Sequence, residues 1–261
     1  MLVEAGGRCV FVHGAASGDG PPVLLLHGAG GDHSIYRFLT RALANRGFRA
    51  LAPDLPGHGA SPPPAATTIE EMAEVTAELV AALNLNQIGI IGHSMGSLVG
   101  LELASSRPDL VDKLMLVATS GTMEVNPRLL EAAEQRSPRA VDMMVDWIHR
   151  GADQLGGHPQ PGSWSRGLTR RLLERALRTG TLAVDLRACA AYPGAERAPK
   201  VTCPTLVVVG TADVMTPPRA GAGLASAIPE AELVELPGAG HGLVFERPGE
   251  LLELAVSFLR P

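Results

Sequence analysis

The amino-acid sequence predicts an α/β protein with a mostly parallel central β-sheet flanked by helices. Short, continuous apolar runs, such as 23–26 and 204–209, are typical of strands that are buried on both faces of a sheet. Longer segments with apolar residues at helical spacing alternate with these runs, and turns rich in glycine and proline separate them. Because parallel strands are joined through crossover helices, this alternation predicts βαβ units.

The first half of the chain shows the alternation most clearly. Strands are expected at 8–13, 23–26, 48–52, 88–91 and 112–118. Helices are expected at 35–46, 67–83 and 97–105. Gly47 is a typical helix stop, and Thr67 and Glu70 have the spacing of a capping box at the start of the second helix.

The alternation stops after residue 120 and resumes at 201. In between, the sequence has only helix-like segments, at 127–136, 140–150, 168–179 and 181–190. Beyond them, strands are expected at 204–209 and 231–236, and helices at 217–227 and 248–259. We therefore expect a core domain made of 1–120 and 201–261, with a helical cap insertion at 121–200 that is placed to act as a lid.

Composition narrows the class of protein. The chain has 261 residues, of which 46% are hydrophobic and 19% charged, as expected for a globular domain with a large core. A net charge of −5 without a basic run argues against nucleic acid or an anionic membrane as a partner. The three scattered cysteines fit neither a disulfide framework nor zinc spacing, and residues 1–7 lack the pattern of a signal peptide. We expect a cytoplasmic monomer or homodimer.

Ser94 is the candidate nucleophile. It lies in Gly92-His93-Ser94-Met95-Gly96, where the apolar strand 88–91 turns sharply into a helix. Such a turn lifts the serine hydroxyl off the backbone and brings strand and helix so close that only glycine fits beside it. The alternative is an ordinary serine that caps a helix.

Two further residues at strand ends could serve Ser94. A serine is a poor nucleophile until a base takes its proton, and the base works best when a carboxylate fixes its tautomer. Catalytic groups in open parallel sheets gather beyond the carboxyl ends of strands. Asp213 and His241 follow the strands at 204–209 and 231–236, and His27-Gly28-Ala29 follows the strand at 23–26. The free backbone N–H groups of that last segment could meet an oxyanion.

Taken together, these motifs resemble the serine-type α/β-hydrolases over nearly the whole chain outside the cap. The matching segments are His27 to Gly31, Asp54-Leu55-Pro56-Gly57-His58-Gly59-Ala60-Ser61, Gly92 to Gly96, Gly210-Thr211-Ala212-Asp213 and Gly240-His241. They occur in the family's chain order of nucleophile, acid and histidine. The resemblance implies a helical cap inserted after the sixth strand of the sheet.

The resemblance also assigns roles to individual residues. It implies that Ser94 is the nucleophile, His241 the general base and Asp213 the orienting acid, and that the backbone N–H groups of Ala29 and Met95 form the oxyanion hole. It implies neither a metal nor an organic cofactor. Lipases often have His-Gly-Gly-Gly where this chain has His27-Gly28-Ala29-Gly30. That departure leaves the contribution of Gly30 open and argues against bulky alcohols.

Other residues have structural interpretations. Asp54 competes with Asp213 as the acid, but it is better suited to an Asx turn in its own loop. The segment after the strand at 112–118 offers no carboxylate. We expect His27 and His93 to be structural and His149 and His158 to be solvated. His33 and His58 lie in loops and could line the pocket, but surface positions are favoured. Five cap residues either form an apolar acyl pocket or pack the cap onto the core, and the sequence leaves both open. They are Met123, Met143, Met144, Trp147 and Trp164.

The leading hypothesis is hydrolysis of a carboxylic ester of a small, largely apolar molecule through an acyl-enzyme. The same triad could instead hydrolyse a C–C bond, open a lactone, hydrolyse a thioester or carry out perhydrolysis. A hypothesis of another class is a non-catalytic receptor that binds a ligand on the hydrolase scaffold. A complete triad argues against that, because binding alone does not need Asp213 and His241.

Overall fold

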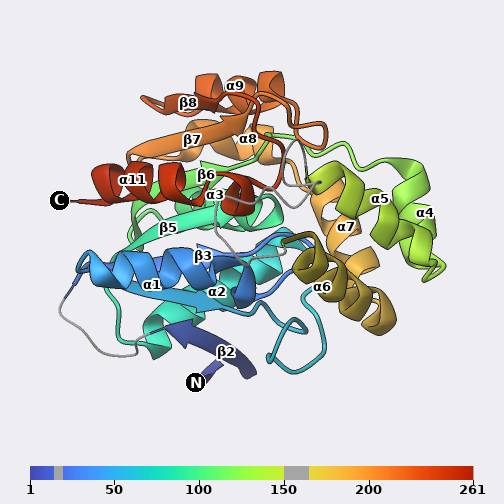
Figure 1. Ribbon diagram of the computed structural model, residues 1–261. Coiled ribbons are helices and arrows are strands. Elements are labelled where there is room, and N and C mark those ends of the chain that lie inside the picture. The colour runs from blue at the N-terminus through green and yellow to red at the C-terminus, as the bar shows by residue number, and fades with distance from the viewer. Residues whose placement is uncertain (15–19, 150–164, 261) are drawn as a thin grey trace.

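The computed structural model describes residues 1–14, 20–149 and 165–260, and these residues form an eight-stranded sheet (Figure 1). In spatial order the strands are β1 (Leu2–Ala5), β2 (Arg8–Gly14), β4 (Arg49–Pro53), β3 (Pro22–Leu26), β5 (Ile88–His93), β6 (Val111–Val117), β7 (Thr205–Gly210) and β8 (Glu232–Leu236). The pairs β1–β2 and β2–β4 are antiparallel, and all the other pairs are parallel. The mostly parallel sheet expected from the sequence is confirmed.

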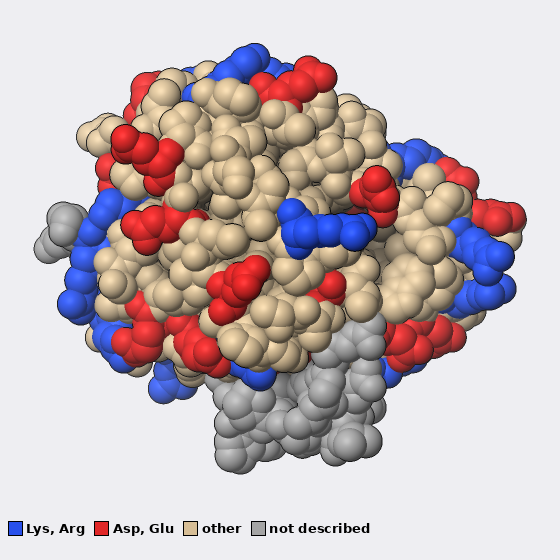
Figure 2. All heavy atoms as spheres, turned by 90° about the horizontal axis from the view of Figure 1, so that it is seen from above, with Lys and Arg blue, Asp and Glu red and all other residues tan. Residues whose placement is uncertain are grey.

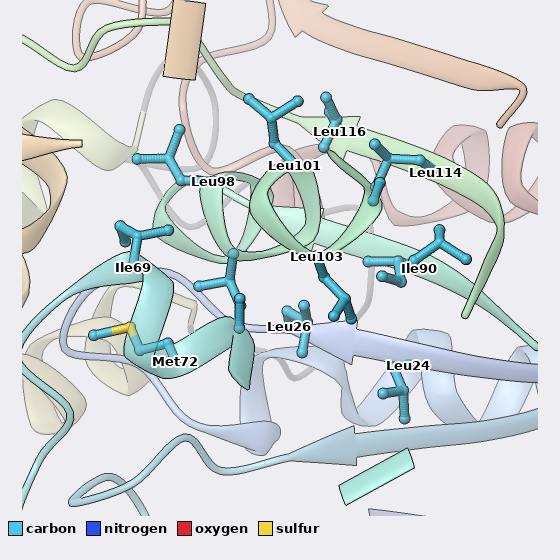
Figure 3. Close-up of a cluster of buried hydrophobic side chains, with 14 of the residues drawn as sticks. Leu24, Leu26, Ile69, Met72, Ile90, Leu98, Leu101, Leu103, Leu114 and Leu116 are labelled. Carbon is cyan, nitrogen blue, oxygen red and sulfur yellow. The ribbon is translucent and has the colours of Figure 1, made fainter. Parts of the chain in front are cut away.

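Each face of the sheet is covered by its own layer of helices. Successive side chains of a strand point to opposite faces, so Leu24 and Leu26 belong to one apolar cluster, whereas Val23 and Leu25 belong to the other. The first cluster is closed by α2 (Ile69–Ala82), α3 (Met95–Ser106) and α9 (Pro218–Ala227) (Figure 3). The second is closed by α1 (Arg37–Asn45) and α11 (Pro248–Leu259), which lie side by side. The strands therefore read as continuous apolar runs.

Only helices lie between β6 and β7 in the described part of the chain. They are α4 (Pro127–Glu134), α5 (Pro138–Ile148), α6 (Ser165–Thr179), α7 (Thr181–Ala191), α8 (Gly194–Arg197) and η3 (Ala198–Lys200). The four helices α4 to α7, called the cap helices below, share a third apolar cluster that includes Leu129, Val145 and Leu177. Figure 1 shows them together at one end of the sheet. The insertion of helices after the sixth strand is confirmed.

Three local details differ from the sequence prediction. The short strand β1 was not expected, because four residues at the chain start are too few to show a clear alternation; it pairs with β2. The helix α3 begins at Met95 and not at 97. At α2 the capping residue is Thr68, whose hydroxyl accepts from the Glu71 N–H, one position later than the spacing of Thr67 and Glu70 suggested.

The surface and the helices add two observations. On the face shown in Figure 2, basic and acidic side chains are interspersed and do not form a patch of one sign. Within the described ranges, every helix is too short or too polar to cross a membrane.

Candidate active site

Ser94 stands at a strained turn between β5 and α3. Its φ of 53° and ψ of −120° lie where residues with a side chain are rarely found. The flanking glycines are required by close backbone contacts: a Cβ on Gly92 would lie 2.3 Å from the Gly96 carbonyl oxygen, and one on Gly96 would lie 2.0 Å from the Leu26 carbonyl oxygen. The turn therefore holds the serine between two closely packed elements.

The structure brings His241 and Asp213 to Ser94. His241 Nε2 lies 3.0 Å from Ser94 Oγ, and His241 Nδ1 lies 2.9 Å from Asp213 Oδ2. Both partners are buried, with 2% of His241 and 4% of Asp213 exposed. Three residues from three separate loops thus form one hydrogen-bonded chain. The sequence places each of them after a strand of the parallel sheet but does not give the distances between them.

Hydrogen bonds from its own loop fix the Asp213 carboxylate. The backbone N–H groups of Met215 and Thr216 donate to Oδ1 at 2.8 and 2.9 Å, and the Thr216 hydroxyl donates to Oδ2 at 2.7 Å. Burial alone would raise the pKa of this carboxyl, but the His241 imidazole and the Thr216 donors outweigh burial and hold the pKa below its ordinary value. An ionised Asp213 accepts the proton of His241 Nδ1, which leaves Nε2 as an acceptor for the Ser94 hydroxyl.

The turn that follows β3 packs against Ser94. A Cβ on Gly28 would lie 3.2 Å from Ser94 Cβ. The backbone N–H groups of Ala29 and Met95 have no acceptor among the residues that the structure describes. The N–H of Gly30, by contrast, donates to Asp185 Oδ2 at 2.8 Å. Ala29 and Met95 therefore retain free donors beside the nucleophile, whereas the Gly30 donor is already engaged.

The two histidines next to these motifs have structural hydrogen bonds. His27 Nε2 accepts from the Leu55 N–H at 3.0 Å, and His27 Nδ1 donates to the Gly28 carbonyl at 2.9 Å. Burial, helped by the nearby His58, lowers the pKa of His27 to about 4, so its ring is neutral at pH 7. His93 Nε2 donates to the backbone carbonyl of His241 at 2.9 Å.

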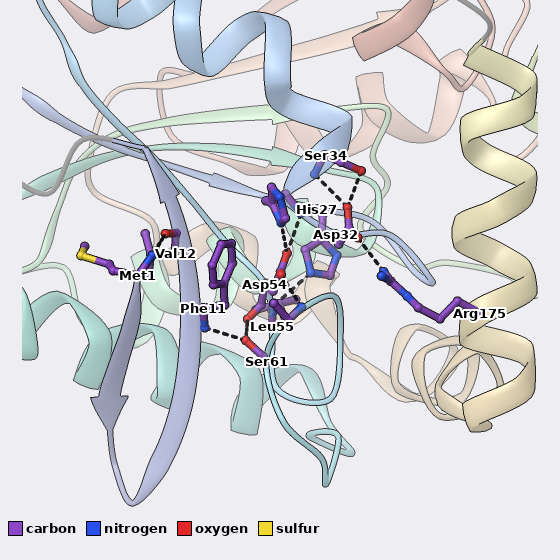
Figure 4. Close-up of polar contacts among 12 residues, drawn as sticks. Met1, Phe11, Val12, His27, Asp32, Ser34, Asp54, Leu55, Ser61 and Arg175 are labelled. Carbon is purple, nitrogen blue, oxygen red and sulfur yellow. Dashed lines mark hydrogen bonds and ion pairs between the residues drawn. The ribbon is translucent and has the colours of Figure 1, made fainter.

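Asp54 is engaged in its own loop. Its buried carboxylate accepts from the backbone N–H groups of His33 and Ala60, both at 2.7 Å, and His33 Nδ1 lies 2.9 Å from Oδ1 (Figure 4). The Ala60 bond closes the Pro-Gly loop, 53–61, on itself, and the two His33 contacts hold this loop against the segment after β3.

Two expectations about histidines are wrong. His58 is not at the surface: it is buried, and its Nε2 lies 2.8 Å from Asp185 Oδ2. His149 is not solvated: it is also buried, and its Nε2 lies 2.9 Å from Thr169 Oγ1. Both errors have the same cause, because these histidines lie within or beneath the cap helices. His158 lies outside the described residues.

Asp185 was not identified as a functional residue from the sequence. It is wholly buried on α7, although it is charged. A signal was available: Asp185 stands one turn before Cys189 and next to Leu186 on the buried side of this helix, and a carboxylate on a buried helix face needs a partner.

A pocket of about 550 Å³ opens at Ser94. Its walls are mostly apolar, and the cap helices and the core both contribute. The apolar lining includes Ile35, Met123, Val125, Leu129, Met144, Trp147, Ile148, Leu172, Leu173, Leu186, Val214, Met215 and Phe245. Glu124 is the one carboxylate among the described lining residues, and these include neither Lys nor Arg. Of the five residues with two open interpretations, Met123, Met144 and Trp147 line the pocket, Met143 packs within the cap helices, and Trp164 lies outside the described residues.

Comparisons with known proteins agree with this architecture. A family model described as alpha/beta hydrolase fold matches residues 21–248. A pimeloyl-[acyl-carrier protein] methyl ester esterase of Chromobacterium violaceum is 32% identical over 237 residues, which cover 86% of this chain and 88% of that protein. A putative carbamate hydrolase of Klebsiella pneumoniae is 28% identical over 236 residues, 85% of each protein. The crystal structure of the enol-lactonase from Burkholderia xenovorans LB400 is similar with a TM-score of 0.89 and 27% identity over 99% of both chains.

Proposed function

The chain belongs to the alpha/beta hydrolase fold family, and on that premise we propose that it hydrolyses carboxylic esters of small, apolar molecules through an acyl-enzyme on Ser94. The observation that carries the proposal is the hydrogen-bonded chain from Ser94 Oγ through His241 to Asp213, with distances of 3.0 and 2.9 Å. Ser94, at one end of these hydrogen bonds, lines an apolar pocket of about 550 Å³, a suitable size for a small ester.

In the acylation step, Ser94 Oγ attacks the ester carbonyl carbon while His241 Nε2 takes the hydroxyl proton. The carbonyl oxygen becomes an oxyanion, and the N–H groups of Ala29 and Met95 donate to it. The ionised Asp213 stabilises the imidazolium that forms. His241 then gives its proton to the leaving alkoxide, and the alcohol departs from the acyl-enzyme.

Deacylation repeats the same steps with water as the nucleophile. His241 takes a proton from a water molecule, whose oxygen attacks the acyl carbon. The second tetrahedral intermediate uses the same two N–H donors. When it collapses, the bond from Ser94 Oγ to the acyl carbon breaks, His241 returns the proton to Oγ, and the carboxylic acid is released. Water is the one co-reactant required.

A lactone is the second candidate substrate. The specific observation in its favour is the similarity to the enol-lactonase structure over 99% of both chains. A lactone is an internal ester, so the acylation step is unchanged except that the alcohol stays attached to the acyl group. C–C hydrolysis, thioester hydrolysis and perhydrolysis would use the same triad with a different leaving group or nucleophile.

The test of this proposal is Ser94→Ala. We expect this variant to lose ester hydrolysis by at least about 10⁴-fold in kcat, because no other group can form the acyl-enzyme. A panel of p-nitrophenyl esters and lactones gives kcat/KM, and a fluorophosphonate probe followed by mass spectrometry shows whether Ser94 is the labelled residue. The matched control is Ser226→Ala, an exposed serine on α9, which is expected to keep wild-type activity.

Two results would contradict the proposal. Near-wild-type activity of Ser94→Ala would remove Ser94 from the mechanism. Absence of labelling in folded wild-type protein would favour a ligand-binding receptor. If the probe labels Ser94 but lactones exceed esters in kcat/KM, the second candidate replaces the first.

A further inference from the structure

Asp185 is a buried carboxylate outside the triad, and it connects a cap helix to the two loops behind the nucleophile. Its Oδ2 accepts from the Gly30 N–H, in the turn after β3, and contacts His58 Nε2, in the loop after β4, both at 2.8 Å. Its Oδ1 has no partner within the described ranges. A buried charge is costly unless it is paired, so its position between these two groups calls for an explanation.

The turn that Asp185 holds has little of its own to fix it. Gly28, Gly30 and Gly31 have no side chains. Among the described residues, the one hydrogen bond between two residues of the turn at 28–31 joins the Gly31 N–H to the Gly28 carbonyl at 3.0 Å. Glycine is the most flexible residue when it is not held by contacts. Ala29, whose N–H is one of the two free donors beside Ser94, lies between these glycines. Its orientation therefore depends on what anchors the turn.

The cap helices supply that anchor. A Cβ on Gly30 would lie 2.9 Å from Leu173 Cδ2 and 3.3 Å from Leu182 Cδ1, so the turn is pressed against α6 and α7. Arg175 of α6 donates to Asp32 at 2.6 Å, just beyond the turn (Figure 4). The one direct polar contact from the cap helices to the turn itself is the bond from the Gly30 N–H to Asp185, as far as the described residues show.

We propose that Asp185 is a positioning residue for the oxyanion hole: by accepting the Gly30 N–H, it fixes the turn at 28–31 so that the Ala29 N–H faces the carbonyl oxygen of a substrate at Ser94. The inference rests on the proposed function. It makes α7 a structural part of the catalytic site, in addition to its place in the pocket wall.

The Asp185 carboxylate also contacts His58, in the loop after β4. Burial alone would lower the pKa of His58, but the Asp185 carboxylate outweighs burial and raises the pKa above its ordinary value. The His27 ring, 4.9 Å away between centroids, stays neutral because its own pKa is about 4. His58 and the Gly30 N–H therefore share one carboxylate oxygen, and the loop after β4 is held against the same turn.

Two substitutions with the same branched shape separate the hydrogen bond from simple packing. Asp185→Asn keeps an oxygen that can accept the Gly30 N–H, whereas Asp185→Leu has two larger methyl groups there and accepts nothing. We expect Asp185→Leu to lower kcat by roughly 10- to 100-fold, since the misplacement of one oxyanion donor has effects of that order. KM should change by less than about threefold, because the donor acts mainly in the transition state. Asp185→Asn should stay within about fivefold of wild type in kcat, because it retains that acceptor.

A second measurement is specific to the oxyanion. A trifluoromethyl ketone adds to Ser94 Oγ and forms a hemiketal whose oxygen occupies the oxyanion position. Its inhibition constant should rise in Asp185→Leu by the same factor as kcat/KM falls, whereas a destabilised but correctly shaped site would not change it. Asp142→Asn, which removes an exposed carboxylate of α5 that pairs with Arg170, is the matched control and should change neither quantity. Melting temperatures ensure that every variant is measured folded, and Asp185→Ala replaces Asp185→Leu if the latter does not fold.

The outcomes are distinct. Unchanged kcat and ketone affinity in Asp185→Leu, with an active wild type, would overturn the positioning role and leave the proposed function intact. Equal losses in Asp185→Asn and Asp185→Leu would also overturn it, because the charge and not the hydrogen bond would then matter. A wild type that neither hydrolyses esters nor reacts with the ketone would refute the proposed function, and the inference with it.

Discussion

The two oxygens of the Asp213 carboxylate have different partners. Oδ1 accepts two backbone N–H groups, from Met215 and Thr216, whereas Oδ2 faces His241 Nδ1 and the Thr216 hydroxyl. Only acceptors can satisfy all four contacts as they stand. Asp213 is therefore specified by its surroundings as an ionised acid, and this suits the orienting role that we propose for it.

The substitution Asp213→Asn tests this difference between the two carboxylate oxygens. The amide oxygen is expected to replace Oδ1, because two N–H groups require an acceptor there, so the NH₂ group would face His241 Nδ1. His241 would then carry its proton on Nε2 and could not accept from Ser94. We expect kcat to fall by about 10³- to 10⁴-fold near pH 7, since an inverted tautomer has effects of this order. Steady-state kinetics check it, with Asp142→Asn as the control; a loss of less than tenfold would argue against Asp213 as the orienting acid.

At the residue scale, sequence reasoning depends on motifs that have a local mechanical cause. The role of Gly92 and Gly96 could be predicted from the sequence, because a Cβ at either position would collide with the backbone nearby. Asp185 and His58 could not be paired, because their contact joins residues 127 apart in the chain and exists only once the cap helices have docked. The triad contacts join residues 28 and 147 apart in the chain. Their positions after strand ends made Asp213 and His241 candidates, and the family resemblance assigned their roles.

At the scale of elements, the alternation of strands and helices made the sheet predictable, because strands buried on both faces have a continuous apolar sequence. The register and the order of the strands are set by pairing between distant segments, which a sequence pattern does not show. The same limit applies to the pocket: the apolar residues of α5 were recognised, but Met144 faces the pocket and its neighbour Met143 does not. That difference depends on how the helix is rotated against the core.

The apolar pocket walls predict a preference for neutral acyl groups. The described lining offers no Lys or Arg to pair with a carboxylate and contains Glu124. A buried carboxylate without a partner costs several kcal/mol. A p-nitrophenyl pentanoate should therefore exceed the matching monoglutarate ester, which has a carboxylate in place of the terminal methyl group, by at least about tenfold in kcat/KM. Equal or reversed values at pH 7.5 would show that a cationic group reaches the pocket.

At the scale of the whole molecule, four histidines give the folding free energy opposite dependences on pH. Burial lowers the pKa of His27 to about 4 and, together with His241, that of His93 to about 3. The pKa of His33 is raised by its hydrogen bond to Asp54, and that of His58 by Asp185 against the effect of burial. An unfolded histidine titrates near pH 6.5. The first pair therefore favours folding at higher pH, and the second pair at lower pH.

The signs follow from proton counting. Between about pH 4 and 6.5, unfolded His27 and His93 are protonated while the folded residues are not. The free energy of unfolding therefore rises with pH in this range and falls on acidification. The stabilisation from His33 and His58 is fully present below pH 6.5 and is lost as pH rises through their raised pKa values. These four groups together place the maximum of stability near pH 6.5.

The variant His93→Gln isolates one of these contributions. Glutamine can still donate to the His241 carbonyl, but it does not titrate. Each proton bound by the unfolded chain alone contributes about 1.4 kcal/mol per pH unit to the slope, so the loss of stability between pH 6 and pH 4 should become shallower by about that amount. Urea unfolding at several pH values measures the slope, and His33→Gln is the control, because it should leave the acid limb unchanged and flatten the decline above pH 6.5. If His93→Gln kept the wild-type acid slope, His93 would have to bind its proton in the folded protein, in spite of its burial against Gly28 and His241.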